Sequence, residues 1–431
     1  MQNHFSGRPV ATLGILALFL AFAANVHAQG PLTPLWIFGD ALNDGGTIYS
    51  APIFDPAGNI YGTASLGGTH GFGMVFKLTP TTSGLWKETV LYNFKGGLAD
   101  GSTPHATLFR DNAGNLYGTT FTGGLNSSKC GQLSPIHGCG IVFKLTPTTE
   151  GEWTETIVHK FGGPEGGNSA TSLVPDKAGN FYGATAGGGS SGLGVIFKMS
   201  KTTTGTWIVT VLHNFTGNPD GINPFIHCMP LVFDSAGNIY GTTELGGAAG
   251  QGIVFKLIPP KTTGGAWAEK ILHTFKDDGV DGKHPLAEVT LDQQGNVFGT
   301  TISGGTHNQG TAYELTAANN YAESILYDFK GPIANDASSP NGLVFDTNGN
   351  LFGTSEIGGI GNNGTIFKLT HTSTGWEETI LHSFALAEGT NPFVPMIFGA
   401  DGHLYGSGWI GGGSGTSSST AGGGSTFEFV P

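Results

Sequence analysis

The chain has 431 residues, of which 74 are Gly and only 11% are charged, and its formal net charge is −13. Nucleic acids and anionic membranes both bind proteins through clustered cations. This chain is acidic, and Arg110 is its single arginine after Arg8, so nucleic acid is excluded as a partner. Because 38% of the residues are hydrophobic and follow a regular β pattern, the composition also excludes a disordered chain.

The first 28 residues have the features of a secretory signal peptide. Arg8 supplies a short basic region, Val10–Ala24 an apolar run, and Val26–Ala28 a small-residue cleavage site. We therefore expect residues 1–28 to be removed and the mature protein to be secreted, either to the periplasm or to the extracellular space. No later apolar run has the length of a membrane span, so we expect none.

One short motif recurs seven times in the rest of the chain. It reads Gly-Asn, an aliphatic or aromatic residue, Tyr or Phe, then Gly, usually followed by Thr. The copies begin at Gly58, Gly114, Gly179, Gly237, Gly295, Gly349 and, in a degraded form, Gly402. Regular self-similarity of this kind indicates a repeat architecture and outweighs the two or three domains that length alone would predict.

Each repeat predicts four strands and no helix. In the second repeat we expect strands at Ala106–Asp111, Leu116–Thr120, Gly140–Thr146 and Trp153–Phe161, the last of which alternates with period two. Asp111–Asn115 predicts a tight turn between the first two strands, because Asp can bond the backbone while Gly and Asn tolerate positive φ.

Aromatic residues mark the third and fourth strands of every repeat. The third-strand residues are Phe76, Phe143, Phe197, Phe255, Tyr313, Phe367 and Phe427. The fourth-strand residues are Phe94, Phe161, Phe215, Phe275, Phe329 and Phe384. The last repeat stops at its third strand, but Leu35–Phe38 near the N-terminus matches Leu91–Phe94. The N-terminal strand can therefore complete the final repeat.

Seven four-stranded repeats closed by a borrowed strand predict an all-β, seven-bladed β-propeller over residues 29–431, which we expect to be a monomer. One blade alone would expose two apolar faces, whereas stacking in a ring buries both. Large aromatic residues suit this burial, since each removes roughly 150–250 Å² from water. A β-helix is the main rival, but the tight Asp-x-x-Gly-Asn hairpins argue against its parallel pairing.

The combined run resembles a known repeat. The motif at Gly114–Thr119, the pair Gly123-Gly124, the strand Gly140–Leu145 and the Trp153–Phe161 strand together resemble the tandem GloVer (Gloeo/Verruco) repeat of bacterial secreted proteins. Their order is also similar to that of NHL-type propeller blades. The resemblance implies a propeller and carries no catalytic residues. Members of the family often end in a sorting or anchoring tail; this chain shows none, so we do not expect surface anchoring.

An acidic residue recurs in each crossing between blades. The seven are Asp44, Asp100, Glu165, Asp220, Asp281, Asp336 and Glu388. Turn chemistry explains them, because Asp can bond a backbone amide before a left-handed Gly and a Pro that sets the next strand. The alternative is a ring of carboxylates around the central channel that binds sugar hydroxyls or a cation such as Ca²⁺, which takes roughly six to eight oxygen ligands. No other cofactor is expected.

Three residues break the pattern of the loops that precede the paired glycines. Glu244, Glu356 and Trp409 occupy one equivalent position where other repeats carry small or apolar residues. They are candidates for ligand binding, because an exception within a repeat is a better functional candidate than the repeat itself. The two glutamates are either solvated loop acids or a carboxylate pair for acid–base chemistry on a glycan.

The cysteines and histidines give weaker signals. Cys130 and Cys139 lie nine residues apart in an exported chain and predict a disulfide across the long loop from Phe121 to Gly140, leaving Cys228 over. Four histidines share one fourth-strand position in different blades, so we interpret them as packing between blades and not as a metal set: His159, His213, His273 and His382. His105, His227 and His284 lie near crossings and are weaker ligand-contact candidates.

No catalytic motif such as Gly-x-Ser-x-Gly or His-Glu-x-x-His is present. We therefore expect a secreted, non-catalytic propeller whose loop face binds an extracellular glycan or a cell-envelope protein. The alternatives are a polysaccharide hydrolase or lyase that uses loop-face carboxylates, and a purely structural surface protein.

Overall fold

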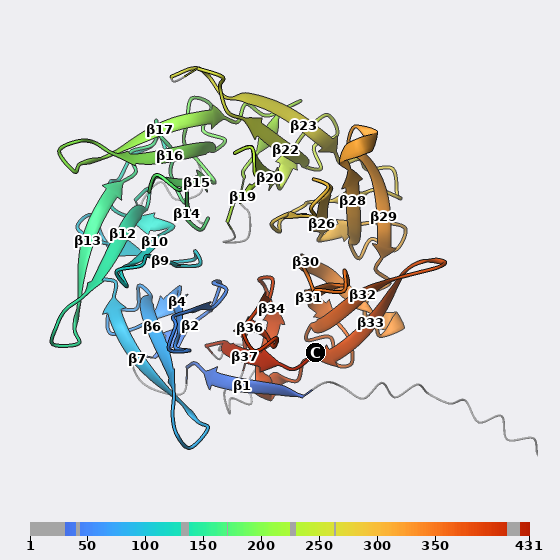
Figure 1. Cartoon of the computed structure of the whole chain (residues 1–431), viewed down its shortest axis with the longest axis horizontal. Helices are drawn as coiled ribbons and strands as arrows, with labels where there is room; N and C mark the ends of the chain where they lie inside the picture. The colour runs from blue at the N-terminus through green and yellow to red at the C-terminus, as the bar shows by residue number, and fades with distance from the viewer. Residues whose placement is uncertain are drawn as a thin grey trace, which may run out of the picture.

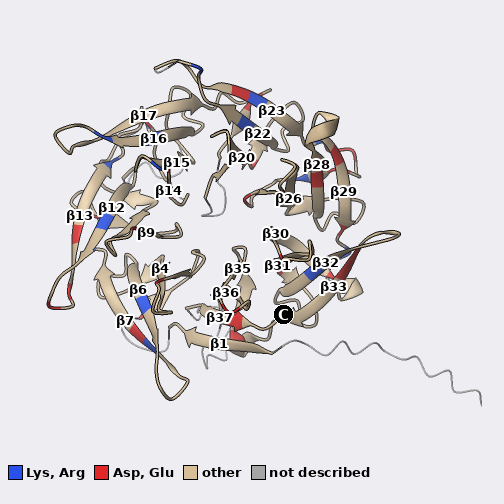
Figure 2. Cartoon of the chain, viewed as in Figure 1, with Lys and Arg blue, Asp and Glu red and all other residues tan. Residues whose placement is uncertain are grey.

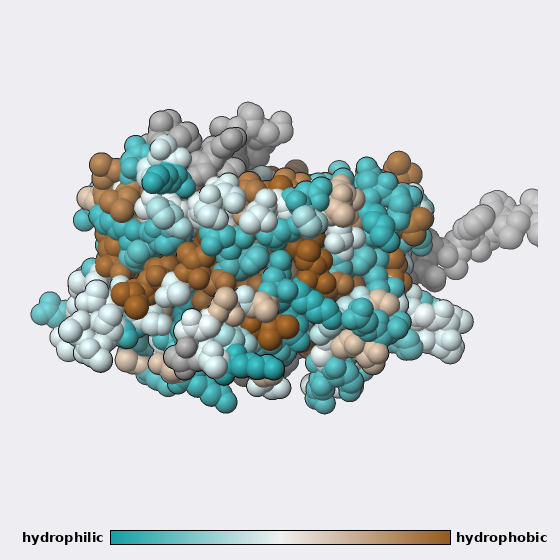
Figure 3. Space-filling view, turned by 90° about the horizontal axis from the view of Figure 1, so that it is seen from above, coloured by the Kyte–Doolittle hydropathy of each residue, from teal (hydrophilic) through white to brown (hydrophobic). Residues whose placement is uncertain are grey.

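A computed structural model describes residues 31–39, 44–130, 138–169, 171–224, 230–262, 264–411 and 423–431. The described chain forms a wheel of seven β-sheets around a central axis (Figure 1). Seen from its edge the wheel is flatter than it is wide, and its surface mixes polar and apolar residues (Figure 3). The predicted signal peptide, Cys228, His137 and His227 lie outside the described residues.

Each blade is an antiparallel sheet of four strands, as the repeat predicts. In blade 2 these are β9 (Phe109–Arg110), β10 (Leu116–Thr119), β12 (Ile141–Pro147) and β13 (Trp153–Lys160), paired in that order. The first strand is shorter than expected, since only Phe109 and Arg110 pair with β10. In the described residues the helical segments are three 3₁₀ turns: Ala317–Asn319, Pro332–Ala334 and Leu386–Glu388.

The other blades repeat this order. The strands are β3 (Ile53–Phe54), β4 (Ile60–Ala64), β6 (Met74–Pro80) and β7 (Trp86–Asn93) in blade 1; β14 (Val174–Pro175), β15 (Phe181–Thr185), β16 (Val195–Lys201) and β17 (Trp207–Asn214) in blade 3; β19 (Val232–Phe233), β20 (Ile239–Thr243), β22 (Ile253–Ile258) and β23 (Ala268–Thr274) in blade 4; β25 (Thr290–Leu291), β26 (Val297–Thr301), β28 (Thr311–Thr316) and β29 (Ala322–Asp328) in blade 5; and β30 (Ala337–Phe345), β31 (Leu351–Gly358), β32 (Thr365–Thr372) and β33 (Gly375–Ser383) in blade 6.

Blade 7 closes the wheel with a strand from the other end of the chain. Its sheet contains β34 (Thr390–Pro392), β35 (Ile397–Phe398), β36 (Leu404–Ile410) and β37 (Ser425–Phe429), and β1 (Leu32–Ile37) is its outermost strand. β1 runs antiparallel to β37, from Leu32 opposite Phe429 to Ile37 opposite Ser425. The predicted closure by the N-terminal strand is therefore confirmed.

The first strand of each blade lies nearest the axis and the fourth forms the outer edge (Figure 1). The innermost strand is therefore the one that follows each blade crossing, such as β9. Charged side chains gather on outer strands such as β13 and β23 (Figure 2). In the described residues, no helix has the length and apolar character needed to cross a membrane.

One aromatic pair fills each of the seven interfaces. The fourth-strand Phe of one blade packs on the third-strand aromatic of the next, with ring centres 4.7–5.4 Å apart: Phe38–Phe76, Phe94–Phe143, Phe161–Phe197, Phe215–Phe255, Phe275–Tyr313, Phe329–Phe367 and Phe384–Phe427. The motif Gly leaves room for this ring, because a Cβ on Gly118 would lie 2.5 Å from Phe143. Burial of these rings is the main force holding neighbouring blades together.

The Thr of the repeated motif adds a hydrogen bond to the same interface. Thr63 Oγ1 donates to the carbonyl oxygen of Ala106, and Thr119 Oγ1 donates to that of Thr171, in each case just before the first strand of the next blade. The bonds are 3.3 and 3.2 Å long and buried. The motif thus supplies the Gly that makes room for the aromatic ring, the Thr hydroxyl that binds the next blade, and part of the tight turn.

Candidate functional site

The blade crossings and the loops between second and third strands meet on one face of the wheel. Short two-stranded ribbons show this directly. In blade 2, β8 (Gly101–Ser102) from the crossing pairs with β11 (Thr122–Gly123) from the loop. The same pairing joins β2 (Gly45–Gly46) to β5 (Leu66–Gly67), β18 (Gly221–Ile222) to β21 (Leu245–Gly246), and β24 (Gly282–Lys283) to β27 (Ser303–Gly304). We call this surface the loop face.

The seven predicted acids all make the same backbone contact. Each carboxylate accepts the N–H of the residue that directly follows the fourth-strand Phe, at 2.8–3.0 Å: Asp44 from Gly39, Asp100 from Lys95, Glu165 from Gly162, Asp220 from Thr216, Asp281 from Lys276, Asp336 from Lys330 and Glu388 from Ala385. This contact closes the crossing turn where the chain leaves the outer strand, as the turn interpretation predicts.

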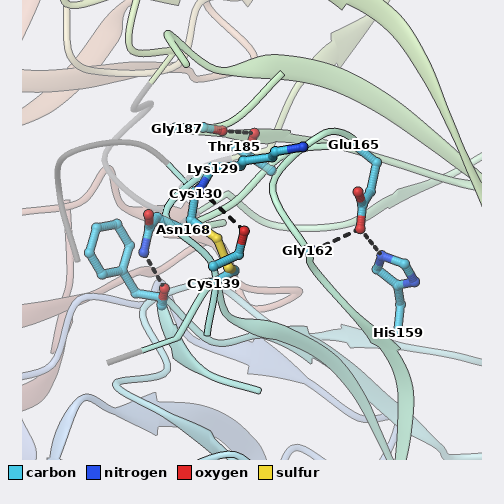
Figure 4. The surroundings of a disulfide bond; sticks show 11 residues. Lys129, Cys130, Cys139, His159, Gly162, Glu165, Asn168, Thr185 and Gly187 are labelled. Carbon is cyan, nitrogen blue, oxygen red and sulfur yellow. Dashed lines mark hydrogen bonds and ion pairs between the residues drawn. A yellow bond between two sulfur atoms is a disulfide. The ribbon is translucent and has the colours of Figure 1, made fainter. Parts of the chain in front are cut away.

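These acids also bind side chains of the outer strand. Asp100 accepts a hydrogen bond from Tyr92, and Glu165 lies 3.4 Å from His159, towards which it turns in Figure 4. The carboxylates thus lie beside the outer strands of the loop face. A ligand role for the seven acids stays a prediction, and it would have to be played there and not at the axis.

A second repeated feature turns the chain towards the axis. The residue three positions after each acid has a left-handed backbone, with φ between 52° and 62°: Thr47, Thr103, Asn168, Asn223, His284, Ser339 and Asn391. Three of these side chains also bind the preceding blade: Asn168 donates to the carbonyl oxygen of Phe121, Ser339 to that of Ile302, and Asn391 to that of Glu356. The strained turn therefore joins neighbouring blades.

Two residues after this turn, the chain delivers a side chain to the loop face, and in three described copies it is an aromatic ring. Tyr49 and His105 have ring centres 4.6 Å apart, and Tyr49 also contacts Phe393 at 5.2 Å. From the loops, Trp409 lies 5.8 Å from both Tyr49 and Phe393, while Phe121 stacks on His105 at 5.3 Å. These five half-buried rings from blades 7, 1 and 2 form what we call the aromatic arc.

The arc contains two buried polar atoms with no hydrogen-bond partner among the described residues, Trp409 Nε1 and His105 Nδ1. Burial lowers the pKa of His105 to about 4, so its imidazole is neutral at neutral pH. A neutral His stacked between aromatic rings behaves as a further flat, weakly polar surface.

Two further loop-face carboxylates, Glu244 and Glu356, come from blades 4 and 6. Glu244 Oε2 accepts a hydrogen bond from Asn223 Nδ2 at 2.9 Å. Burial raises the pKa of Glu356, whose carbonyl oxygen is held by Asn391 two residues before Phe393. The structure thus places Glu244, Glu356 and Trp409 on the loop face, with Trp409 in the aromatic arc.

Sequence reasoning missed Glu288, which lies just before β25 on the innermost strand of blade 5. Burial raises the pKa of Glu288 to about 8, so it is largely protonated at neutral pH. A signal was available: the equivalent residues in the other repeats are small or Pro, namely Ala51, Thr107, Ser172, Pro230, Gly342 and Pro395. Tyr49, His105 and Phe393 were also missed as a group. Only the left-handed turn places their side chains together, and the repeated motifs do not reveal it.

The long loop of blade 2 is fastened next to the arc. Cys130 and Cys139 form a disulfide with Cα atoms 5.5 Å apart (Figure 4). Asn168 of the next crossing binds both ends of this region, because its N–H donates to the carbonyl oxygen of Cys139 and its Nδ2 donates to that of Phe121. The loop is thus coupled directly to one ring of the aromatic arc.

A hollow of about 580 Å³ lies elsewhere, against the turns between first and second strands of blades 6 and 7. Phe345, Phe352, Lys368 and Phe398 line it. None of the predicted site residues lies in it, so it is separate from the loop-face site.

The fold and the loop face define the class of this protein: a closed seven-bladed β-propeller with aromatic rings and carboxylates on one face. The profile of the Gloeobacter/Verrucomicrobia repeat matches residues 25–227, 131–331 and 230–428. Because these matches span almost the whole chain, the protein belongs to the Gloeobacter/Verrucomicrobia repeat family, as the sequence resemblance predicted. A search of functionally characterised proteins finds no match to this sequence.

Solved structures resemble the chain in shape. A putative oxidoreductase (glucose dehydrogenase) from Thermus thermophilus is 12% identical over 93% of this chain and 100% of its own, with a TM-score of 0.39. A luciferin-regenerating enzyme is 13% identical over 75% and 88%, with a TM-score of 0.37. A protein of unknown function from Dyadobacter fermentans is 11% identical over 93% and 99%, with a TM-score of 0.42.

Proposed function

We propose that this protein is a secreted, non-catalytic binding protein whose loop face recognises an extracellular glycan, neutral or amine-bearing. The aromatic arc is the observation that carries the proposal. Sugar rings present flat C–H faces that pack on aromatic side chains, and five half-buried rings in mutual contact offer a surface of that kind.

The carboxylates across the loop face support the same ligand class. Ionised carboxylates are acceptors only, so Glu244 suits the O–H donors of a sugar or the N–H donors of an amino sugar. A site with a few polar groups beside an aromatic wall is the usual composition of a small-molecule site. The acidic chain, at −13, disfavours polyanionic glycans.

The proposal is tested by screening the mature chain against a glycan array and measuring affinity for the best ligand. We expect Trp409→Ala and Tyr49→Ala each to weaken binding at least tenfold, because each removes a stacking surface. Phe72→Ala is the matched control: Phe72 is a 44% exposed aromatic residue on the same face but outside the arc, so binding should not change. Saturable glycan binding that survives both arc substitutions would overturn the proposal. If the chain binds only an envelope protein, the ligand of the loop face is that protein and not a glycan.

A second candidate is a polysaccharide hydrolase or lyase, favoured by the raised pKa values of Glu288 and Glu356. Glu288, whose pKa burial raises to about 8, is a carboxylic acid kept protonated near neutral pH and can act as a general acid. Incubation with a polysaccharide panel decides between the two. Cleavage that disappears in Glu288→Gln, Glu356→Gln or a Glu244→Ala/Glu356→Ala variant would establish an enzyme, whereas binding without cleavage supports the binding protein.

A further inference from the structure

The outer edges of the blade interfaces hold paired carboxylates. At five interfaces the crossing acid is Asp and the outer strand of the next blade places a Glu beside it: Asp44 with Glu88, Asp100 with Glu155, Asp220 with Glu269, Asp281 with Glu323 and Asp336 with Glu378. At the other two the crossing acid is the longer Glu, and the partner position is apolar: Glu165 with Val209 and Glu388 with Leu32. A short crossing acid, Asp, is therefore accompanied by a second acid from the next blade, whereas the longer crossing acid, Glu, is accompanied by an apolar residue.

At four of these five pairs a third side chain, from the outer strand of the first blade, faces both acids: Tyr92, His213, His273 and Tyr327. Where it is Tyr, one hydroxyl serves both acids: Tyr92 lies 3.0 Å from Asp100 Oδ2 and 3.1 Å from Glu155 Oε2. These are ordinary hydrogen-bond lengths. At the Tyr92 interface the hydroxyl therefore lies within hydrogen-bond distance of both acids, although Glu155 Oε1 has no hydrogen-bond partner among the described residues.

Two adjacent interfaces carry His in place of this Tyr, and their geometry differs. His213 Nε2 lies 3.3 Å from Asp220 and 3.6 Å from Glu269. His273 Nε2 lies 3.2 Å from Asp281 and 3.5 Å from Glu323. The longer separation in each set exceeds a good hydrogen bond. His213 Nε2 and Glu269 Oε1 are buried atoms with no hydrogen-bond partner among the described residues.

The three ligand atoms of each set lie within 4.8 Å of one another. Metal–ligand bonds of about 2.0–2.1 Å in a tetrahedral site place neighbouring ligand atoms about 3.3 Å apart, close to the distances from the His nitrogen to the two carboxylates at both interfaces. When all three groups act as ligands, a neutral imidazole and two ionised carboxylates carry a charge of about −2, which a divalent ion neutralises.

We propose that these two sets, His213/Asp220/Glu269 and His273/Asp281/Glu323, are binding sites for a divalent transition-metal ion such as Zn²⁺. Imidazole and carboxylate are ligands that Zn²⁺ uses in proteins, and three protein ligands leave a fourth position for water. Each ion would join two blades, blade 3 to blade 4 and blade 4 to blade 5. The inference is independent of the proposed glycan site.

The chain supplies its own control substitution. Tyr stands at the equivalent positions 92 and 327, so His213→Tyr and His273→Tyr replace each metal ligand by a side chain that this interface already accommodates. Glu269→Gln and Glu323→Gln form a second, nearly isosteric pair of variants. A separate cluster of Asp401, His403 and Glu428 at a blade 7 hairpin also has ligand groups, and His403→Asn restores the residue found in the other repeats.

The experiment uses chelator-treated full mature chain carrying His403→Asn, titrated with Zn²⁺ alone by calorimetry and with Co²⁺ alone by visible absorption. We expect two ions per chain, one fewer in each single His→Tyr variant and none in the double variant, with the same loss in the Glu→Gln pair. Zn²⁺ should raise the Tm of the His403→Asn protein and not that of the double variant, because only a site in the folded state stabilises it. Absence of binding, a stoichiometry unchanged in the double variant, or binding abolished by His403→Asn alone would each overturn the proposal.

Discussion

Ser407 Oγ donates a buried hydrogen bond of 3.0 Å to the carbonyl oxygen of Ser50, although 357 residues separate them along the chain. Ser407 occupies the Thr position of the seventh, degraded motif, and Ser50 lies just before β3, the first strand of blade 1. The bond is thus the same one that Thr63 and Thr119 make between consecutive blades. The interface that joins the two ends of the chain therefore carries the same hydrogen bond as those that follow blades 1 and 2.

The first prediction concerns this closing interface. Phe38→Ala should lower the free energy of unfolding by about 3–5 kcal/mol, because Phe38 is fully buried against Phe76 and its removal leaves a cavity. Urea unfolding measures the change. Phe94→Ala, which removes the equivalent ring between blades 1 and 2, is the matched comparison and should cost a similar amount. A loss below about 1 kcal/mol for Phe38→Ala alone would mean that the ring is not closed there.

A second prediction concerns Tyr313, the one tyrosine among the seven third-strand aromatics. Its hydroxyl is buried without a hydrogen-bond partner in the described part of the chain, and the six equivalents are Phe. Tyr313→Phe should raise the free energy of unfolding by about 1–3 kcal/mol, because it removes an unsatisfied buried polar group. Thermal melting tests this; Tyr321→Phe, which removes a half-buried hydroxyl that does have a partner, Tyr240, is the comparison and should not stabilise the protein. A destabilised Tyr313→Phe protein would show that the hydroxyl has a partner.

A third prediction uses the left-handed turn. Thr47 adopts φ 62°, which costs a β-branched residue roughly 1–2 kcal/mol, whereas Asn tolerates this conformation. Thr47→Asn should therefore stabilise the protein by about 1 kcal/mol. The reverse change, Asn391→Thr, should destabilise it, since it restores the strain and removes the hydrogen bond to Glu356. Denaturant midpoints that move the opposite way would contradict this account.

A fourth prediction concerns pH. Burial, reinforced by the charge of Asp100, raises the pKa of Glu155 from 4.5 to about 7. Between these values the folded chain holds a proton that the unfolded chain releases, so this group's contribution is complete below pH 4.5 and is lost as the pH rises through about 7. Glu155→Gln should flatten the fall in Tm between about pH 5 and about pH 8. An unchanged slope would show that Glu155 is ionised in the folded protein.

The sequence predicts the wheel well because each interface reuses local chemistry. The Asp111 turn, the ring space above Gly118 and the Phe pairs are all short patterns repeated at a fixed spacing, and Leu35–Phe38 matches Leu91–Phe94 closely enough to reveal the closing strand. The contacts of the seven acids were predicted only in part. Turn chemistry explained their repetition, but not that each accepts the N–H that follows an outer-strand Phe.

The aromatic arc could not be predicted, because its members belong to two different repeat positions. Tyr49, His105 and Phe393 follow left-handed turns, whereas Phe121 and Trp409 stand in loops. Only ring closure brings blades 7, 1 and 2 side by side. The His213 and His273 sets were hidden for a related reason: the four histidines do not meet one another, and the carboxylates that they face come from a crossing and from the next blade.

The pairing of β1 with β37 has a practical consequence. Both ends of the folded chain leave the wheel together at the outer edge of blade 7, where Val430 N donates to the carbonyl oxygen of Pro31. A short linker could therefore join them, and new ends could be cut at a surface hairpin such as the one between β6 and β7. A circularly permuted chain would keep all seven interfaces while moving the point of attachment to another place on the rim.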